Sequence, residues 1–475
     1  MNAVITPHRF TGTFRVPASK SHTIRRLLIA ALVDGVSKIE YPLDSLDARS
    51  CAAACRALGA EITERHAVDP SCANPPDERG EKLIGYTVRG IGFGVNGGNL
   101  KAPARPIDVG NSGTTLFLAL AAAALGSSPI EFDGDEQIRR RSAAPLLEAL
   151  AGLGIRAESK NGNGCAPIVI QGPWKGGRVS LPCPTSQYLS AILLAAPLAP
   201  TGIVTEIDVP LLNERPYIEM TLSYLDAQGI HYETDDNFSY FRISGGASYK
   251  SANGPVPGDF SSAAFPGSAA VIGGLAAGDI GGPVTLLGLD PNDQQGDKAI
   301  FDMLQKMGAS VKWKKVESAG SAGSEWRLTV SRSGPLRGGE FDLNDTPDLL
   351  PIMAVLGCYA EGKTALVNVA HARIKETDRI AVMASVLGKL GADVEERPDG
   401  IIIHGNSNTA AAQQRALHGG TVDGHGDHRV VMALAAAALG ATGPVEITGA
   451  ESAAVTYPGF LELLEAEINP SITWL

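Results

Sequence analysis

The pattern of apolar and polar positions along the chain repeats one unit, in which a helix-like stretch ends at a glycine and an alternating, strand-like stretch follows. A glycine in this position is typical of a left-handed helix C-cap, so each copy predicts a helix followed directly by a strand. The copies lie at intervals of 95, 75, 79 and 83 residues, which favours repeated α/β units over the helix–glycine–strand order that any α/β protein can contain. The glycines are Gly59, Gly154, Gly229, Gly308 and Gly391.

Six such units would fill the chain, with the last one, after Gly459, cut short. We expect domain boundaries near residues 13–17, which end in Pro17, and near residues 251–260, where proline and glycine cluster. We therefore predict an α/β protein of two similar halves with the active site in the cleft between them. The predicted domains are residues 1–15 with 256–475, which contain both termini, and an inserted domain of residues 16–255.

Composition narrows the possible partners of this 475-residue chain. A net charge of −11 and a pI of about 5.4 argue against nucleic acid as the main partner, although local cations can still bind a small anion. The six cysteines are scattered without zinc-binding spacing, which favours reduced thiols in a cytoplasmic protein. The longest apolar runs are about half the length that spans a bilayer.

Polar stretches at 69–82 and 406–420 predict exposed loops. The glycine pattern at 92–97 formally matches the dinucleotide-binding fingerprint, but no apolar helix follows it, so we do not predict a dinucleotide site there.

Hydroxyl-rich turns precede apolar helices at three places in the first half. In "PASKSHTIRR", Lys20 lies between serines and Arg25 follows one turn later, which suits a phosphate or carboxylate; alternatively, Ser19 is only an N-cap and Lys20 is solvated. The turn "GNSGTT" is followed by Leu116 and Phe117 rather than by a cation. In "PTSQYLS", Thr185 opens a helix that either binds a phosphate or polyol or merely carries a capping box.

The second half has three polar clusters at predicted helix starts. Asp348, ahead of a buried helix, either interacts with the helix dipole or acts as a general base. In "RIKETDR", Glu376 and Arg379 either belong to a binding site or form a surface salt bridge of little energetic value. In "GDHRVV", His428 and Arg429 precede an apolar helix, and no carboxylate or cysteine set completes a metal site. Cations at helix starts in both halves predict a site for a small polyanion, with acid–base and electrostatic chemistry.

Taken together, these motifs resemble the 5-enolpyruvylshikimate-3-phosphate synthase family of enolpyruvyl transferases. The resemblance covers nearly the whole chain and includes "PASKSHTIRR", "GNSGTT", "PTSQYLSAILL", "RPYIEMTL", "TPDLLPIMA", "RIKETDR" and "GDHRVVMALAAAALG" in the right order. It implies two domains, each of three βαβαββ units arranged as an inside-out α/β barrel. It also implies a transferase of aromatic amino-acid biosynthesis that moves the enolpyruvyl group of phosphoenolpyruvate to the 5-hydroxyl of shikimate 3-phosphate. Such an enzyme would be a cytoplasmic monomer that uses no metal or organic cofactor and binds neither nucleic acid nor a membrane.

The resemblance also implies roles for individual residues. Asp348 would take the proton of the attacking 5-hydroxyl, Glu376 would handle the methylene proton, and Lys20 would assist catalysis. The residues implied to bind shikimate 3-phosphate are Lys20, Ser21, Arg25, Thr185, Ser186, Gln187, Tyr217, Asp348 and Lys375. Those implied to bind phosphoenolpyruvate are Lys20, Gly113, Arg141, Gln187, Arg379, His428 and Arg429.

Three positions depart from the family pattern. Phe117 stands where members usually have an arginine, Val455 where they have a lysine, and Glu214 where they have a phosphate-contacting serine. Two cations are therefore lost and one acid is gained, and the candidate replacements for the lost cations are Arg26, Arg139 and Arg140. Two alternatives to the synthase stay open: a paralogue that transfers enolpyruvyl to another hydroxyl acceptor, and a binding protein without catalysis, which would have no use for two retained acids.

Overall fold

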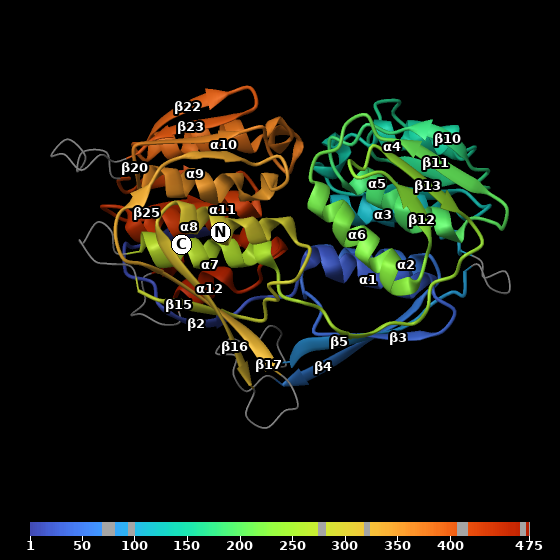
Figure 1. The fold of residues 1–475 in the computed structure, drawn as a ribbon, viewed down its shortest axis with the longest axis horizontal. Coiled ribbons are helices and arrows are strands. Elements are labelled where there is room, and N and C mark those ends of the chain that lie inside the picture. Colours follow the sequence, from blue (N-terminus) through green and yellow to red (C-terminus); the bar gives the residue numbers. More distant parts are fainter. Residues whose placement is uncertain are drawn as a thin grey trace. The chain divides into compact units, whose positions relative to one another are not determined.

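The computed structural model describes residues 1–68, 81–93, 100–273, 282–317, 324–405, 417–465 and 472–474. Within it the chain divides into two compact units (Figure 1), and it crosses from one to the other after Pro17 and after Val256. We name them the terminal unit, Met1–Pro17 with Pro257–Leu475, and the inserted unit, Ala18–Val256. Most of the two predicted loops and of the fingerprint at 92–97 lies outside the described residues.

The inserted unit contains three four-stranded sheets with the strand orders β14-β3-β5-β4, β6-β7-β9-β8 and β10-β11-β13-β12. In each sheet the first two strands are parallel and the other neighbours are antiparallel. The strands are β3 (Val36–Glu40), β4 (Glu61–Val68), β5 (Glu81–Arg89), β6 (Ile107–Asp108), β7 (Ile130–Asp133), β8 (Arg156–Ser159), β9 (Ile168–Gln171), β10 (Gly177–Ser180), β11 (Val204–Asp208), β12 (Tyr232–Thr234), β13 (Tyr240–Ser244) and β14 (Asn253–Pro255).

The terminal unit repeats this plan in sheets β2-β15-β17-β16, β19-β21-β23-β22 and β24-β25-β1-β26, beside a two-stranded sheet β18-β20. Again one neighbouring pair is parallel and the other two are antiparallel. The strands are β1 (Asn2–Ile5), β2 (Gly12–Arg15), β15 (Val284–Leu287), β16 (Ala309–Glu317), β17 (Ser324–Arg332), β18 (Leu336–Arg337), β19 (Glu340–Asp342), β20 (Ala360–Glu361), β21 (Lys363–Val367), β22 (Asp393–Arg397), β23 (Gly400–His404), β24 (Gly420–Asp423), β25 (Val445–Thr448) and β26 (Ile472–Trp474).

The repeating helix–glycine–strand pattern is confirmed. All five glycines have positive φ, between 69° and 119°, the region that glycine enters at little steric cost. The strand after each of them, β4, β8, β12, β16 or β22, forms one edge of its sheet. The same pattern therefore marks an edge of five of the six four-stranded sheets that the described residues form.

The sixth sheet corrects the expectation that the last unit is cut short. Its third strand is β1, from the beginning of the chain, which pairs antiparallel with both β25 and β26. Ala3 lies opposite both Ile447 and Trp474. The last unit is thus complete, and the N-terminal strand belongs to it.

Three helices form the centre of each unit, and they are buried almost all round. In the terminal unit every residue of α7 (Phe260–Ile272), α9 (Leu350–Cys358) and α11 (His428–Gly440) is buried, as expected for helices without a polar face. Figure 1 shows them between the strands β22 and β23 on one side and β15 and β2 on the other. The more exposed helices are α8 (Ala299–Lys306), α10 (Arg379–Lys389) and α12 (Phe460–Glu465). None of the described helices is both long and apolar enough to cross a membrane.

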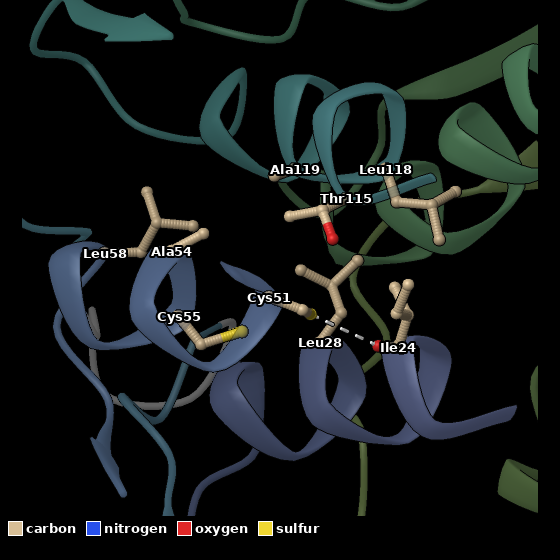
Figure 2. Close-up of a pocket in the computed structure, with 9 residues that line it drawn as sticks. All are labelled: Ile24, Leu28, Cys51, Ala54, Cys55, Leu58, Thr115, Leu118 and Ala119. Atoms are coloured by element: carbon tan, nitrogen blue, oxygen red, sulfur yellow. Dashed lines mark hydrogen bonds between the residues drawn. The ribbon is translucent and has the colours of Figure 1, made fainter. Parts of the chain in front are cut away.

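In the inserted unit the central helices are α1 (Lys20–Leu32), α3 (Gly113–Ala123) and α5 (Gln187–Ala195), with α2 (Leu46–Ala57), α4 (Ala144–Gly152) and α6 (Arg215–Gln228) outside them. Figure 2 shows Cys51 and Cys55 of α2 facing α1 and Thr115 of α3, and the Cys51 thiol donates a hydrogen bond to the carbonyl of Ile24. A hydrogen bond with Cys55 and burial raise the pKa of Cys51 well above its usual value, so this thiol is protonated and packs as a small apolar group. The five described cysteines are buried and free, and Cys72 lies outside the described residues.

Candidate active site

A fully buried arginine organises the polar cluster of the terminal unit. Arg379 begins α10, whose N-terminus is capped by Asp378. The Arg379 guanidinium, 0% exposed, donates from Nη1 to Asp348 Oδ1 at 2.6 Å and from Nη2 to Glu376 Oε2 at 2.7 Å. Its Nε donates to Asp427 Oδ2 at 2.8 Å. One guanidinium thus holds three carboxylates, among them both predicted acid–base residues.

Asp348 lies in the 3-10 turn η5 (Pro347–Leu349), directly before α9. Its second oxygen pairs with Arg429 Nη2 at 2.7 Å, and its side chain is 21% exposed. Burial alone would raise the pKa of Asp348, but the positive charges of Arg429, Lys375 and Arg379 outweigh burial and hold the pKa well below its usual range. Asp348 is therefore ionised at neutral pH.

The charges of this cluster balance, which explains how so many of them can be buried. Three cations, Arg379, Arg429 and Lys375, act on three carboxylates, those of Asp348, Glu376 and Asp427. Buried charges are tolerated when they are paired and hydrogen-bonded. Asp427 is also the N-cap of α11, where it accepts a hydrogen bond from the backbone N–H of Arg429. His428, the first residue of α11, is buried beside it.

The sequence left two interpretations of Glu376 and Arg379 open, and the structure excludes the surface salt bridge. The pair exists, but Arg379 is completely buried and the Glu376 side chain is only 14% exposed. Asp427 was missed as a partner of Arg379, although its place before "HRVV" fits an N-cap. Asp297 was also missed: it is fully buried in the turn η4 (Gly296–Lys298) and accepts a hydrogen bond from the Ser261 hydroxyl.

Asp297 gives the stability of this unit a pH dependence. Burial and the negative charge of Asp348 raise the pKa of Asp297 from 3.8 to about 7, against the opposing charge of Arg429. The folded chain therefore holds this proton more tightly than the unfolded chain does. The resulting stability is fully present below about pH 4 and is lost as the pH rises through 7, at most ~4 kcal/mol.

We therefore expect Asp297→Asn to stabilise the chain relative to the natural chain, by clearly more at pH 8 than at pH 5, where the folded carboxyl still holds its proton. The amide is neutral at every pH, and its oxygen can still accept the hydrogen bond from Ser261. Unfolding temperatures of both chains at pH 5 and pH 8 measure the effect, with Asp393→Asn, an exposed site in β22, as the control. An unfolding-temperature difference between the variant and the natural chain that is the same at both pH values would contradict this assignment.

In the inserted unit, the turn that begins α1 holds Lys20 in a buried ion pair. Lys20 Nζ lies 3.2 Å from Asp47 Oδ2, and the two side chains are 16% and 8% exposed. Ser19 is the N-cap of α1, as the alternative without a binding site predicted, but Lys20 is not the solvated surface residue of that alternative. Asp47, in the first turn of α2, was not predicted from the sequence.

Arg25 connects the three helices α1, α5 and α6. Its guanidinium donates to Thr221 Oγ1 at 3.0 Å, to Ser190 Oγ at 3.3 Å and to the backbone oxygens of Ser21 and Tyr217. Burial lowers the pKa of Arg25 to about 10, although negative groups nearby, including Glu214, oppose this. Arg25 therefore remains charged at neutral pH, in a place where its hydrogen bonds run to neutral oxygen atoms.

The turn "GNSGTT" does have a cation beside it, supplied by a distant residue. A Cβ atom at Gly113 would lie 2.7 Å from Arg141 Nη1 and 3.7 Å from Gln187 Oε1, so a larger residue would displace the guanidinium. The structure thus brings Gly113, Arg141 and Gln187 together, as the resemblance implied. The ring of Phe117 would lie 3.6 Å from the same Cβ atom, and it packs edge-on against Tyr188 at a centroid distance of 5.0 Å.

The cations considered as replacements for the lost ones have other partners. Arg139 pairs with Asp133 at 2.6 Å and Arg140 with Glu136 at 3.3 Å, both at exposed positions. Arg26 donates to the backbone oxygens of Gly254 and Pro255 in β14. None of these partners belongs to the predicted binding sets. Val455, where a lysine was expected, ends the 3-10 turn η7 (Ala450–Val455).

Thr185 and Ser186, ahead of α5, both donate to the carboxylate of Glu214. The distances to Glu214 Oε2 are 3.0 Å from Thr185 Oγ1 and 2.8 Å from Ser186 Oγ. The hydroxyls implied to bind the 3-phosphate of the acceptor are therefore occupied by a carboxylate of the chain itself. No cluster of three metal-ligating side chains was found among the described residues.

Each unit is built on three four-stranded sheets, with one parallel and two antiparallel pairings, around buried helices, which is the fold of the enolpyruvyl transferases. The EPSP synthase (3-phosphoshikimate 1-carboxyvinyltransferase) family model matches residues 4–464. The chain belongs to this family. A 3-phosphoshikimate 1-carboxyvinyltransferase of Acetivibrio thermocellus is 45% identical over 454 residues, covering 96% of this chain and 95% of the relative.

Similar proteins come from distant organisms. A 3-phosphoshikimate 1-carboxyvinyltransferase of Halobacterium salinarum is 42% identical over 470 residues, covering 98% of both chains. Among solved structures, an EPSP synthase from Acinetobacter baumannii matches with a TM-score of 0.76 at 28% identity, over 99% of each chain. The likeness therefore extends over both units.

Proposed function

We propose that this chain transfers the enolpyruvyl group of phosphoenolpyruvate to the 5-hydroxyl of shikimate 3-phosphate and releases inorganic phosphate, in the shikimate pathway of aromatic amino-acid biosynthesis. The observation that carries this proposal is the cluster around Arg379, in which two acids lie beside three cations. The acids suit two proton transfers, and the cations suit a substrate with a carboxylate and a phosphate. The full-length match to the family supports the same reaction.

The reaction we infer is an addition followed by an elimination. A proton adds to the methylene carbon of phosphoenolpyruvate, and the acceptor's 5-hydroxyl oxygen bonds to the neighbouring carbon as its own proton leaves. This gives a tetrahedral intermediate that carries both phosphate and acceptor. The C–O bond to phosphate then breaks, and the methyl group gives up a proton to restore the alkene. We assign Glu376 to the methylene and methyl proton transfers and Asp348 to the hydroxyl proton, with Lys20 interacting with the substrates' negative charge.

The pairing of Asp348 suggests how substrate binding prepares it for this role. Arg379 and Arg429, its ion-pair partners, are also the residues that we propose for phosphoenolpyruvate. A bound substrate anion would draw their positive charge away from Asp348. The pKa of Asp348 would then rise toward a useful range, because the cations that lower it are shared.

Phosphate release from phosphoenolpyruvate, with and without shikimate 3-phosphate, tests this function. We expect release only when the acceptor is present, and we expect Glu376→Gln to slow it roughly tenfold or more because the proton donor is lost. Glu395→Gln, which alters an exposed carboxylate in β22, should leave the rate unchanged. The proposal fails if the natural chain binds phosphoenolpyruvate but releases no phosphate with this acceptor.

A different hydroxyl acceptor is the second candidate, and Glu214 is the observation that favours it. A carboxylate at the hydroxyls of Thr185 and Ser186 opposes a second anion there. Phosphate release with unphosphorylated cyclitols, run beside the assay above, separates the two candidates. We also propose that the protein acts in the cytoplasm as a monomer, which gel filtration with light scattering would test.

A further inference from the structure

Glu214 holds an unusual position directly before α6. Its backbone is left-handed, with φ 60° and ψ 41°, a conformation that residues other than glycine seldom adopt. Its side chain is buried, and Oε2 accepts three hydrogen bonds, from Thr185 Oγ1 at 3.0 Å, Ser186 N at 3.0 Å and Ser186 Oγ at 2.8 Å. Three donors on one carboxylate oxygen form a well-made anion-binding arrangement.

The surroundings of this carboxylate favour negative charge. Ser186 is the N-cap of α5, so its backbone N–H lies at the positive end of a helix of nine residues. Arg25 brings a buried positive charge to α5 and to α6, the helix that follows Glu214. Its guanidinium donates to Ser190, one turn into α5, and to Thr221 in α6. Among the described residues, the hydrogen-bond acceptors of the Arg25 guanidinium are hydroxyl and backbone carbonyl oxygens. Its charge acts on the Glu214 carboxylate through space, so this place favours a negative group.

We propose that the Glu214 carboxylate occupies the place of the acceptor's phosphate group and must withdraw before a phosphorylated acceptor can bind. This inference rests on the proposed function, because it takes Thr185 and Ser186 as the residues that bind that phosphate. The same donors cannot serve two anions at once, so Glu214 competes with the ligand from within the chain. Glu214 is then a specificity-determining residue: it weakens binding of phosphorylated acceptors and affects unphosphorylated ones little.

Glu214→Ser tests the proposal, since serine is short and uncharged. We expect the KM for shikimate 3-phosphate to fall about tenfold, the value of one charge-assisted hydrogen bond. The KM for phosphoenolpyruvate and the KM for any unphosphorylated acceptor that is turned over should change less than about twofold. Glu219→Ser is the matched control, because Glu219 lies on the same helix and pairs with Arg215 at a half-exposed position.

A second variant and a binding measurement make the test independent of turnover and of folding. Glu214→Gln keeps the size of the side chain and removes its charge, and it serves as the test if the serine variant does not fold. We also expect inorganic phosphate to raise the unfolding temperature of the Glu214 variants more than that of the natural chain or of Glu219→Ser.

The outcomes separate this inference from the proposed function. The inference is overturned if folded Glu214 variants have an unchanged or higher KM for shikimate 3-phosphate and inorganic phosphate stabilises them no more than the natural chain. Glu214 would then only position Thr185 and Ser186. If no chain turns over shikimate 3-phosphate, the proposed function fails. Selective stabilisation of the Glu214 variants by inorganic phosphate would then still support occupation of an anion site by Glu214.

Discussion

Replacement of Arg379 by alanine is expected to lower the unfolding temperature of the terminal unit by about 10 °C. Arg379 is completely buried and holds the carboxylates of Asp348, Glu376 and Asp427. Without it these acids would repel one another in a buried place, and breaking a buried ion pair in this way costs about 3–5 kcal/mol. Scanning calorimetry of the ligand-free protein measures the effect.

Two further variants control for simple loss of a charged side chain. Arg379→Lys keeps the charge but cannot reach all three carboxylates with one planar group, so its unfolding temperature should lie between those of alanine and the natural chain. Arg397→Ala removes an exposed arginine that pairs with Glu395, and it should cost less than about 1 kcal/mol. If Arg379→Ala unfolds within a degree or two of Arg397→Ala, the cluster does not depend on Arg379 as we argue.

Replacement of Asp348 by asparagine is expected to lower kcat by about 10²- to 10⁴-fold, because the amide cannot accept the hydroxyl proton. The KM for phosphoenolpyruvate should stay the same or fall, since the carboxylate that now pairs with Arg379 and Arg429 is gone. A purely structural role would raise the KM and lower the unfolding temperature instead. Steady-state kinetics with both substrates varied gives these values separately.

Asp393→Asn again supplies the control, as an exposed carboxylate in the same unit. The assignment of Asp348 as the base would be wrong if Asp348→Asn kept kcat within about threefold of the natural chain. A variant that loses both kcat and thermal stability would indicate that the ion pairs of Asp348 matter more than its basicity.

The local features of the fold could be predicted because short stretches determine them. Glycines such as Gly229 end helices through their own backbone conformation, and the apolar run after His428 has no polar face to expose. Helix starts are equally local, as Ser19 and Asp378 show by capping α1 and α10. These signals located the starts of both helices correctly.

The partners of the charged residues could not be predicted in this way, because they come from distant parts of the chain. Asp427 is 48 positions from Arg379, and Glu214 is 28 positions from Ser186. Their contacts depend on how the sheets place neighbouring helices, which no local pattern records. From the sequence alone, Arg379 could have been part of a binding site or of a surface salt bridge, and Glu214 was an added acid. The structure shows a buried network at Arg379 and hydrogen bonds from Thr185 and Ser186 to Glu214.

The pairing of β1 with β25 and β26 has a consequence for how the chain folds during synthesis. The inserted unit, Ala18–Val256, is continuous in sequence, so all of it leaves the ribosome while most of the terminal unit is still unmade. The terminal unit can close its last sheet only when its first and last strands meet, after nearly the whole chain has been synthesised. Until then β1 is an unpaired strand with apolar positions such as Ile5, the kind of edge that invites aggregation. The order of translation thus favours early folding of one unit and leaves the nascent N-terminal strand in need of protection until synthesis ends.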